Sequence, residues 1–188
     1  MFSIDLADDA QLFPLEVRHA EEFLAHMDRG REYIGQYVAL PDVTADLDST
    51  RAYLTNYARK AATDTGRLYG IRVDGTLVGG VLFRTFDVAS GTCEAGCWLE
   101  PTMAGRGLVT TACRILIDWA FRERGMHRVE WHAASENKKS LAVAARLGMT
   151  RDGVMRQNDL HHGVRQDTEV WSVLAHEWPP VGPPVGPA

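Results

Sequence analysis

Two segments, CWLEPTMAGRGLVTTACRILIDWA at 97–120 and ENKKSLAVAARLGM at 136–149, decide the fold. In the first, a strand-like stretch runs into a loop in which Gly105 and Gly107 open an amphipathic helix. Glycines let a ligand approach the backbone, and the free N–H groups at a helix start suit a phosphate. No Lys-Ser/Thr pair follows, which excludes a Walker loop, and Thr110 replaces the third glycine of the dinucleotide motif. Taken alone, the segment is equally typical of a structural turn before a core helix.

The second segment predicts a helix that begins near Asn137. Asparagine is a favoured N-cap residue, and Ser140 follows one turn later on the same side of the helix. Ordinary helix capping accounts for both residues when this segment is taken alone.

The sequence around these segments predicts alternating strands and helices. A helix at 108–124 connects strand 92–99 to strand 127–133, so these two strands are expected to be parallel neighbours. Strands 67–73 and 76–86 form a hairpin at the Asp74-Gly75 turn and a meander with strand 92–99. The remaining expectations are a strand at 10–14, helices at 15–28 and 135–147, a helix capped by Thr44 or Asp46 that runs to about Ala62, a loop with Gly30, Gly35 and Pro41, and a final strand pair at 149–156 and 168–175.

This order of elements mixes both kinds of strand pairing. It predicts an α+β (mixed α/β) fold in which about four helices flank a twisted mixed sheet of about six or seven strands. The length of 188 residues favours a single domain, placed at 1–177. The tail at 178–188 contains five of the eight prolines and is expected to be disordered or extended.

Composition and charge exclude several classes of protein. No run of about 18 apolar residues predicts a membrane span, and the acidic start lacks the basic n-region of a signal peptide. The three cysteines, Cys93, Cys97 and Cys113, form no CxxC pair, so we expect no disulfide framework, no zinc site and a reducing cytoplasm. A net charge of −5 disfavours general nucleic-acid binding.

The charge is unevenly distributed along the chain. Residues 1–50 hold 11 acids and 3 bases, whereas residues 101–150 hold 8 bases and 4 acids. An acidic front would suit a cationic substrate and a basic middle an anionic cofactor, although ordinary solvated faces also explain the pattern.

The two segments together carry a family resemblance. Strand, glycine loop, helix, strand and an N-x-x-S helix that ends in L-G-M resemble the GNAT superfamily of acyl-CoA-dependent N-acetyltransferases. The family's pyrophosphate loop, commonly Q/R-x-x-G-x-G/A, aligns with AGRGLV at 104–109. Gly107 keeps the central glycine, while Ala104 and Val109 depart from the outer positions. The resemblance covers residues 10–175.

Finer features resemble the ribosomal-protein serine/alanine N-terminal acetyltransferases and their relatives. CEAGCWL at 93–99 is similar to the A-E-I-G-Y-W-L-like strand of that branch, with Cys97 in place of an aromatic residue. LGM at 147–149 and DGVMR at 152–156 are similar to its LGF and E-G-V-L-R stretches. Gly163 and Asp167 match a later G-x-x-x-D.

The resemblance implies acetyl-CoA as the cosubstrate and no metal. The cofactor would lie where strand 92–99 splays from strand 127–133, with main-chain groups on its pantetheine arm and loop amides on its pyrophosphate. Asn137 would bind the pantetheine side. The implied cofactor-binding residues are Cys97, Trp98, Leu99, Ala104, Gly105, Arg106, Gly107, Leu108, Val109, Thr110, Asn137 and Ser140.

Acetyl transfer needs a base for the amine and an acid for the departing CoA thiolate. Glu94 is the predicted base, with pairing to Arg84 as its structural alternative and His132 as a second candidate. The resemblance implies that Ser140 protonates the thiolate, a role that a tyrosine plays in other branches of the family, and no tyrosine follows Tyr69 here; a helix-turn hydrogen bond is the structural alternative for Ser140. An α-amine, with a pKa of about 7.7–8.0, costs under about 1 kcal/mol to deprotonate near neutral pH, and a lysine costs about 4 kcal/mol. An N-terminal amine therefore needs only a modest base.

Acceptor specificity is expected from the first 60 residues and from a loop at 157–167. Tyr33, Tyr37 and His161 are the predicted substrate-binding residues, with His161 and His162 on a mobile loop over the substrate. Further rim candidates, which caps and solvated surface explain equally well, are Asp42, Asp46 and Asp48.

These features predict an acetyl-CoA-dependent N-acetyltransferase. The leading acceptor is a protein or peptide N-terminal α-amine, which attacks the thioester directly in a ternary complex. A small-molecule amine, such as an antibiotic or a polyamine, is the alternative acceptor, and a non-catalytic acyl-CoA-binding regulatory module is the alternative function. Family analogy predicts a homodimer, and neither nucleic acid nor membrane is expected as a partner.

Overall fold

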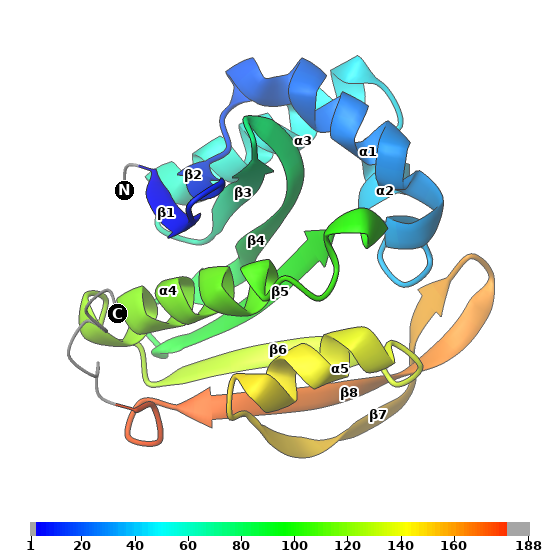
Figure 1. Cartoon of the computed structure of the whole chain (residues 1–188). Coiled ribbons are helices and arrows are strands. Elements are labelled where there is room, and N and C mark those ends of the chain that lie inside the picture. Colours follow the sequence, from blue (N-terminus) through cyan, green and yellow to red (C-terminus); the bar gives the residue numbers. More distant parts are fainter. Residues whose placement is uncertain (1–2, 180–188) are drawn as a thin grey trace.

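Eight strands form one mixed sheet within residues 3–179, the part of the chain that the computed structural model describes (Figure 1). The strand order across the sheet is β1-β2-β3-β4-β5-β6-β8-β7. The strands are β1 (Ile4–Ala7), β2 (Ala10–Pro14), β3 (Arg67–Val73), β4 (Thr76–Asp87), β5 (Thr92–Leu99), β6 (Arg128–Ala134), β7 (Thr150–His161) and β8 (Val164–Leu174). The α-helices are α1 (Ala20–Gly35), α2 (Leu40–Val43), α3 (Leu47–Ala62), α4 (Leu108–Arg122) and α5 (Lys138–Arg146).

The predicted mixed α/β fold is confirmed, with two departures in number. The described residues hold eight strands and five α-helices, against about six or seven and about four expected from the sequence. The additional strand is β1, a four-residue edge strand. The additional helix is the short α2, which begins with Leu40 and Pro41 in the segment predicted as a loop.

The predicted parallel pair is β5 and β6, and it parts midway. Register pairing joins Thr92–Ala95 to Arg128–Trp131 and stops there, although both strands continue (Figure 1). Beyond this point β5 stays paired with β4, from Leu82↔Gly96 to Gly79↔Leu99, and β6 stays paired with β8. The sheet therefore opens between Gly96–Leu99 and His132–Ala134, which confirms the predicted splay.

Two hydrophobic clusters cover the two faces of the sheet. One packs α4 and α5 against β5 and β6, with Leu116, Ile117 and Trp131 at its centre. The other packs α1 and α3 against β3, β4 and the end of β5, with Phe23 and Leu54 buried there. The splay is thus an opening between β5 and β6 in a sheet whose two faces are packed by separate clusters.

The N-terminal helices correct one prediction and confirm another. The helix expected at 15–28 begins at Ala20, after a 3₁₀ turn, and continues through Gly30 to Gly35. Gly30 lies inside this helix at a crowded position, where a Cβ would lie 2.7 Å from Ile34 Cδ1. The expected second helix is α3, and Asp46 caps it by accepting a hydrogen bond from the Ser49 N–H.

The prediction of a loop at 157–167 is wrong. β7 and β8 continue as one hairpin to a two-residue turn at His162 and Gly163, which have φ values of 47° and 81°. Two positive φ values in succession match the twist of a tight hairpin. Asp167 stabilises the irregular part of β7, because its Oδ1 accepts the Gln157 N–H at 2.8 Å.

The C-terminal end of the described residues docks on α4. The Trp178 ring packs against Phe121, with centroids 5.8 Å apart, and its Nε1 donates to Asp118 at 3.3 Å. The predicted disorder of the tail from residue 180 onward lies outside the described residues. Among residues 3–179, no helix is long and apolar enough to cross a membrane.

Candidate active site

The glycine loop before α4 has the shape of an anion cradle. Gly105 and Gly107 have φ values of 86° and 77°, and nothing lies within 4 Å of the positions where their Cβ atoms would be. Gly107 is the N-cap of α4, whose first N–H groups have no partner within the helix. The side chains of Leu108 and Val109 are buried, so only their main-chain amides can contribute. An open loop at the positive end of a helix dipole fits a pyrophosphate.

The splayed part of β5 lies beside this loop and has one unpaired edge. Gly96 to Leu99 are paired with β4 on one side and, within residues 3–179, with no strand on the other. The Trp98 side chain is buried among α1 and α3, and the half-buried Cys97 contacts the buried Cys113 of α4. The free edge can therefore offer main-chain groups to an amide-containing arm such as pantetheine.

Trp98 fits at this position because β4 has two glycines opposite it. A Cβ on Gly80 would lie 2.3 Å from the Trp98 ring, and one on Gly79 would lie 2.6 Å from the Trp98 carbonyl oxygen. The Trp98 Nε1 donates to His26 Nε2 at 2.9 Å, and His26 Nδ1 lies 2.6 Å from Glu100 Oε1. This chain fixes the end of β5 to α1, and sequence reasoning missed it.

Ser140 lies in the first turn of α5 with its hydroxyl already oriented. The Trp131 Nε1 donates to Ser140 Oγ at 2.9 Å, which occupies an acceptor site and leaves the hydroxyl proton to be donated elsewhere. The Asn137 side chain caps the helix by accepting the Ser140 N–H at 3.1 Å. The predicted cap is thus present, and Asn137 keeps its amide NH₂ for a ligand. Sequence reasoning missed Trp131, although strand alternation in RVEWHA separates it from His132.

Glu94 lies on the opposite face of the sheet and is paired. Its Oε1 is 3.1 Å from Arg84 Nε, which is the structural alternative predicted for this carboxylate. Its register partner on β6 is Glu130, whose Oε1 accepts from Arg128 Nε at 2.8 Å. Two carboxylates on neighbouring strands are thus each compensated by an arginine.

His132 lies on the same face, one step beyond the end of the β5–β6 pairing. Its Nε2 is 3.1 Å from Glu130 Oε2, and its side chain is 28% exposed. Because side chains alternate along a strand, His132 and Glu130 face away from Trp131 and Ser140. The candidate bases Glu94 and His132 therefore lie on one face of the sheet, and the candidate acid Ser140 lies on the other.

The predicted acceptor tyrosines lie at the C-terminal end of α1. The Lys139 Nζ donates to the Tyr33 hydroxyl at 2.9 Å and lies 4.6 Å from the centre of its ring, so Tyr33 reaches the start of α5 beside Ser140. Tyr37 is half-buried, and its hydroxyl accepts from the Gln36 side chain at 3.3 Å. Tyr33 thus contacts Lys139, the residue before the predicted acid in sequence, and no described contact links either tyrosine to Ser140 itself.

The two histidines at the β7–β8 turn dock on the same corner. His161 is buried, and its Nε2 lies 2.8 Å from the Gly35 carbonyl oxygen. His162 stacks on it with ring centroids 4.0 Å apart and meets Asp42 Oδ2 at 3.0 Å. The predicted mobile loop is therefore a docked hairpin. Of the other rim candidates, Asp46 is a helix cap and Asp48 lies 3.6 Å from Arg51.

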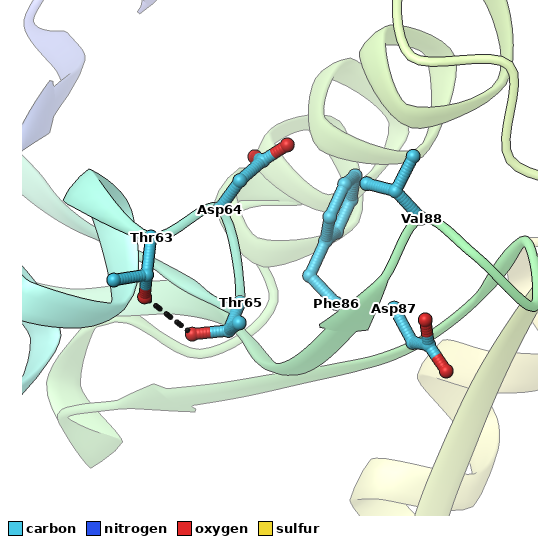
Figure 2. A pocket seen from close by; sticks show the side chains of 6 residues that line it. All are labelled: Thr63, Asp64, Thr65, Phe86, Asp87 and Val88. Atoms are coloured by element: carbon cyan, nitrogen blue, oxygen red, sulfur yellow. Dashed lines mark hydrogen bonds between the residues drawn. The ribbon is translucent and has the colours of Figure 1, made fainter.

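A surface pocket of about 310 Å³ lies between the turn after α3 and the end of β4 (Figure 2). It is lined by Thr63, Asp64, Thr65, Phe86, Asp87 and Val88, next to the beginning of β5 rather than its splayed end. Asp64 is paired there with Arg67 and Arg124. Among the described residues, no group of three His, Cys, Asp or Glu side chains could hold a metal ion.

Burial keeps two of the cysteines inert. Burial raises the pKa of the Cys93 thiol to about 12, and the contact with Cys97 together with burial raises that of Cys113. A thiol with a raised pKa is a poor nucleophile, so both residues act as small apolar side chains.

Comparison with known proteins agrees with this geometry. Residues 11–150 match the family described as "Acetyltransferase (GNAT) domain". A Bacillus subtilis protein named putative ribosomal N-acetyltransferase YdaF is 28% identical over 95% of this chain and 98% of its own length. The probable N-acetyltransferase YjcK of the same organism is 31% identical over 86% of this chain and 91% of its own. A crystal structure of a probable acetyltransferase superposes with a TM-score of 0.87 at 28% identity, covering 95% of this chain and 99% of that chain.

The matched region contains the glycine loop, the splayed strands and the start of α5. The family match spans most of the chain, and the relatives are aligned over nearly their full length. The chain therefore belongs to the GNAT acetyltransferase family and is an N-acetyltransferase that uses acetyl-CoA as its cosubstrate.

Proposed function

We propose that this enzyme acetylates the N-terminal α-amine of a protein or peptide. The observation that carries the proposal is the division of the site by the splay: Ser140 lies on the α5 face, and Glu94 and His132 lie on the other. The amine arrives on one face and attacks the thioester carbonyl through the opening between β5 and β6. The CoA thiolate leaves on the other face as its bond to the acetyl carbon breaks.

The cofactor is held by main-chain groups in this proposal. The amides of 104–109 and the dipole of α4 bind the pyrophosphate, with Thr110 on the next turn. The free edge of Gly96–Leu99 pairs with the pantetheine arm, and an N–H of this edge stabilises the oxyanion. Asn137 donates its side-chain NH₂ to the same arm. The departures at Ala104 and Val109 matter little here, since backbone amides supply the contacts.

Ser140 protonates the departing thiolate. Because the Trp131 indole already donates to its Oγ, the Ser140 hydroxyl proton is directed away from Trp131. A thiolate is a good leaving group, so a weak acid at hydrogen-bond distance is sufficient.

The paired state of Glu94 favours an α-amine as the acceptor. The Glu94 Oε1 already pairs with Arg84 Nε at 3.1 Å, and the His132 Nε2 lies 3.1 Å from Glu130 Oε2, so each candidate base already has a partner. An α-amine needs under about 1 kcal/mol of deprotonation near neutral pH, whereas a lysine needs about 4 kcal/mol. Glu94 or His132, acting through water, is then sufficient for the first acceptor but not for the second.

The named relatives support the same acceptor class. The protein named putative ribosomal N-acetyltransferase YdaF aligns over 95% of this chain. A ribosomal-protein-serine acetyltransferase of Escherichia coli aligns over 90% of it at 18% identity.

The cofactor site is tested by calorimetric binding of acetyl-CoA to the wild type and to Gly107→Trp. We expect binding with a Kd in the micromolar range that the substitution abolishes, because the indole would fill the cradle. Gly125→Trp is the matched control: Gly125 follows the C-terminal end of α4, has a φ of 64° and has nothing within 4 Å of its Cβ position. Absence of binding by the folded wild type, or equal loss in both variants, would contradict this cofactor site.

The acceptor is tested by release of free CoA thiol. Peptides that begin with serine or alanine are compared with the same peptides blocked at the α-amine but carrying a lysine, and with a polyamine. We expect turnover with the free α-amine alone. Turnover with the polyamine alone would assign a small-molecule acceptor, and binding without turnover of any amine would assign a regulatory acyl-CoA-binding protein.

A further inference from the structure

Arg106, in the middle of the glycine loop, is held by a carboxylate from the N-terminal hairpin. Asp9 lies in the turn between β1 and β2, and its Oδ1 and Oδ2 accept from Arg106 Nη2 at 2.8 and 2.7 Å. The other terminal nitrogen, Nη1, lies 3.5 Å from Met103 Sδ. The cation of the loop is therefore directed toward the β1–β2 turn.

The hairpin presents Asp9 from a fixed position. The Asp9 carbonyl oxygen accepts the Asp74 N–H at 2.9 Å, and the next residue, Ala10, pairs with Val73 of β3. The hydrogen bond from Arg106 holds the pKa of the Asp9 carboxyl below its usual value, so the group is charged at neutral pH. Both side chains are about one-third exposed, at 36% and 37%, so a soluble anion can reach the pair.

The surroundings of the pair are acidic. A hollow of about 250 Å³ beside it is lined by Asp8, Asp9, Asp74 and Arg72, together with Gln11 and Gly75. Arg72 is itself paired with Glu22 through two hydrogen bonds. A phosphate that approaches the loop from this side meets carboxylates whose charge has the same sign as its own.

We propose that Asp9 competes with the phosphates of the cofactor for Arg106 and thereby lowers the affinity of the enzyme for acetyl-CoA and CoA. The inference rests on the proposed cofactor site at 104–109. Binding transfers the guanidinium from Asp9 to a phosphate, and release of CoA returns it. Asp9 thus favours departure of the product, since a replacement partner for Arg106 is already in place.

Calorimetric titration of five proteins tests the competition. Acetyl-CoA is titrated into the wild type, Asp9→Asn, Asp8→Asn, Arg106→Ala and the double variant Asp9→Asn/Arg106→Ala at low and physiological salt. We expect Asp9→Asn to bind about threefold to tenfold more tightly than the wild type, with the larger effect at low salt. Asp8→Asn removes the same charge from the same turn, but within residues 3–179 Arg106 is paired with Asp9 and not with Asp8. Its Kd should change by less than about twofold, and the gain should disappear in the double variant.

The same series separates failure of the inference from failure of the cofactor site. Weaker or unchanged binding by Asp9→Asn, or an equal gain in Asp8→Asn, would overturn the competition while wild-type binding still supports the site. No binding by the folded wild type would overturn both. Titration of dephospho-CoA identifies the phosphate: a gain that persists assigns the pyrophosphate, and a gain that is lost assigns the 3′-phosphate. Thermal unfolding of each variant confirms that it is folded.

Discussion

At the scale of single residues, the role that we propose for Ser140 depends on Trp131, which lies nine positions away. The Trp131 indole donates to the Ser140 hydroxyl at 2.9 Å, and the helix cap at Asn137 fixes the Ser140 backbone. The motif N-x-x-S by itself predicts only a capped helix turn. The contact with Trp131 directs the Ser140 hydroxyl proton away from the indole. Removing this hydroxyl should therefore change the rate of acetyl transfer.

Ser140→Ala should lower kcat about tenfold to hundredfold and leave the Kd for acetyl-CoA nearly unchanged. The variant removes a proton donor that acts only as the thiolate leaves, so binding of the ground state is not affected. Thiol release at saturating acetyl-CoA, with calorimetry for binding, measures both quantities. Ser135→Ala, on the loop before α5, serves as the control. A raised KM for acetyl-CoA with an unchanged kcat would instead assign Ser140 to cofactor binding.

His26 predicts how stability depends on pH. The ring is fully buried, and Trp98 donates to its Nε2, so its proton lies on Nδ1 toward Glu100. Burial lowers the His26 pKa below its ordinary value of 6.5, against the opposing effect of Glu100. Because the folded-state pKa is the lower one, the unfolded chain binds this proton first as the pH falls. The stability contributed by neutral His26 is therefore complete above about pH 6.5 and declines below it.

His26→Gln should make the free energy of unfolding less dependent on pH. Glutamine can accept from Trp98 and donate to Glu100 but does not titrate. Urea unfolding at about pH 7.5 and about pH 5.5 should show a smaller loss of stability in the variant than in the wild type. Equal losses in the two proteins would show that His26 does not contribute to the acid sensitivity.

At the scale of elements, the sequence predicts strands well where burial alternates and turns are marked. β3 and β5 have the predicted bounds, since both are bordered by turn residues and are largely buried. β7 was predicted too short because almost every residue in it is exposed, which leaves no hydrophobic pattern to follow. Its extension depends on pairing with β8 and on the contact of Asp167 with Gln157, and both are tertiary features.

The features of the candidate site also fall into two groups, those that a local motif predicts and those that depend on tertiary contacts. The glycine loop and the capped start of α5 are local features that the residues themselves predict, whereas the splay was implied by the family resemblance. The contacts of Arg106 with Asp9, Ser140 with Trp131, and Trp98 with His26 join elements that are distant in sequence. No periodicity or motif in a single sequence reports such contacts, so the structure is needed to find them.

Gly79 and Gly80 of β4 leave room for Trp98 at the end of β5, so a larger residue at Gly80 should lower the free energy of unfolding. A Cβ on Gly80 would lie 2.3 Å from the Trp98 ring, which is locked by His26 and cannot move freely. Gly80→Ala should therefore lower the free energy of unfolding by about 1–3 kcal/mol. Gly153→Ala is the control on β7, where nothing lies within 4 Å of the Cβ position, and its effect should stay within about 0.5 kcal/mol. Similar unfolding midpoints for the two variants in urea would show that Trp98 is free to shift.

At the scale of the whole molecule, one sheet connects two cores. The cluster around α4 and α5 contains Leu116 and Trp131, and the cluster around α1 and α3 contains Leu54 and Trp98. β4 and β5 contribute to both clusters, since alternate residues face opposite sides. The C-terminal hairpin also contacts the N-terminal helices, because the β7–β8 turn docks on Gly35 and Asp42. Neither core can lose its packing without exposing the shared strands.

Substitutions in either core should therefore lower the stability of the whole chain in one transition. Leu54→Ala and Leu116→Ala each remove a side chain that is at most 1% exposed, and each should reduce the free energy of unfolding by about 2–5 kcal/mol. Far-UV circular dichroism follows the whole fold, and tryptophan fluorescence reports both cores, so the two probes should give coincident urea transitions in the wild type and in both variants. A second transition that appears only in Leu54→Ala would show that the N-terminal helices unfold separately. The end of β5 and the splay would then lose their support from α1 while the glycine loop on α4 stays folded, so acetyl transfer should be lost and acetyl-CoA binding should weaken, because only the loop amides would still hold the cofactor.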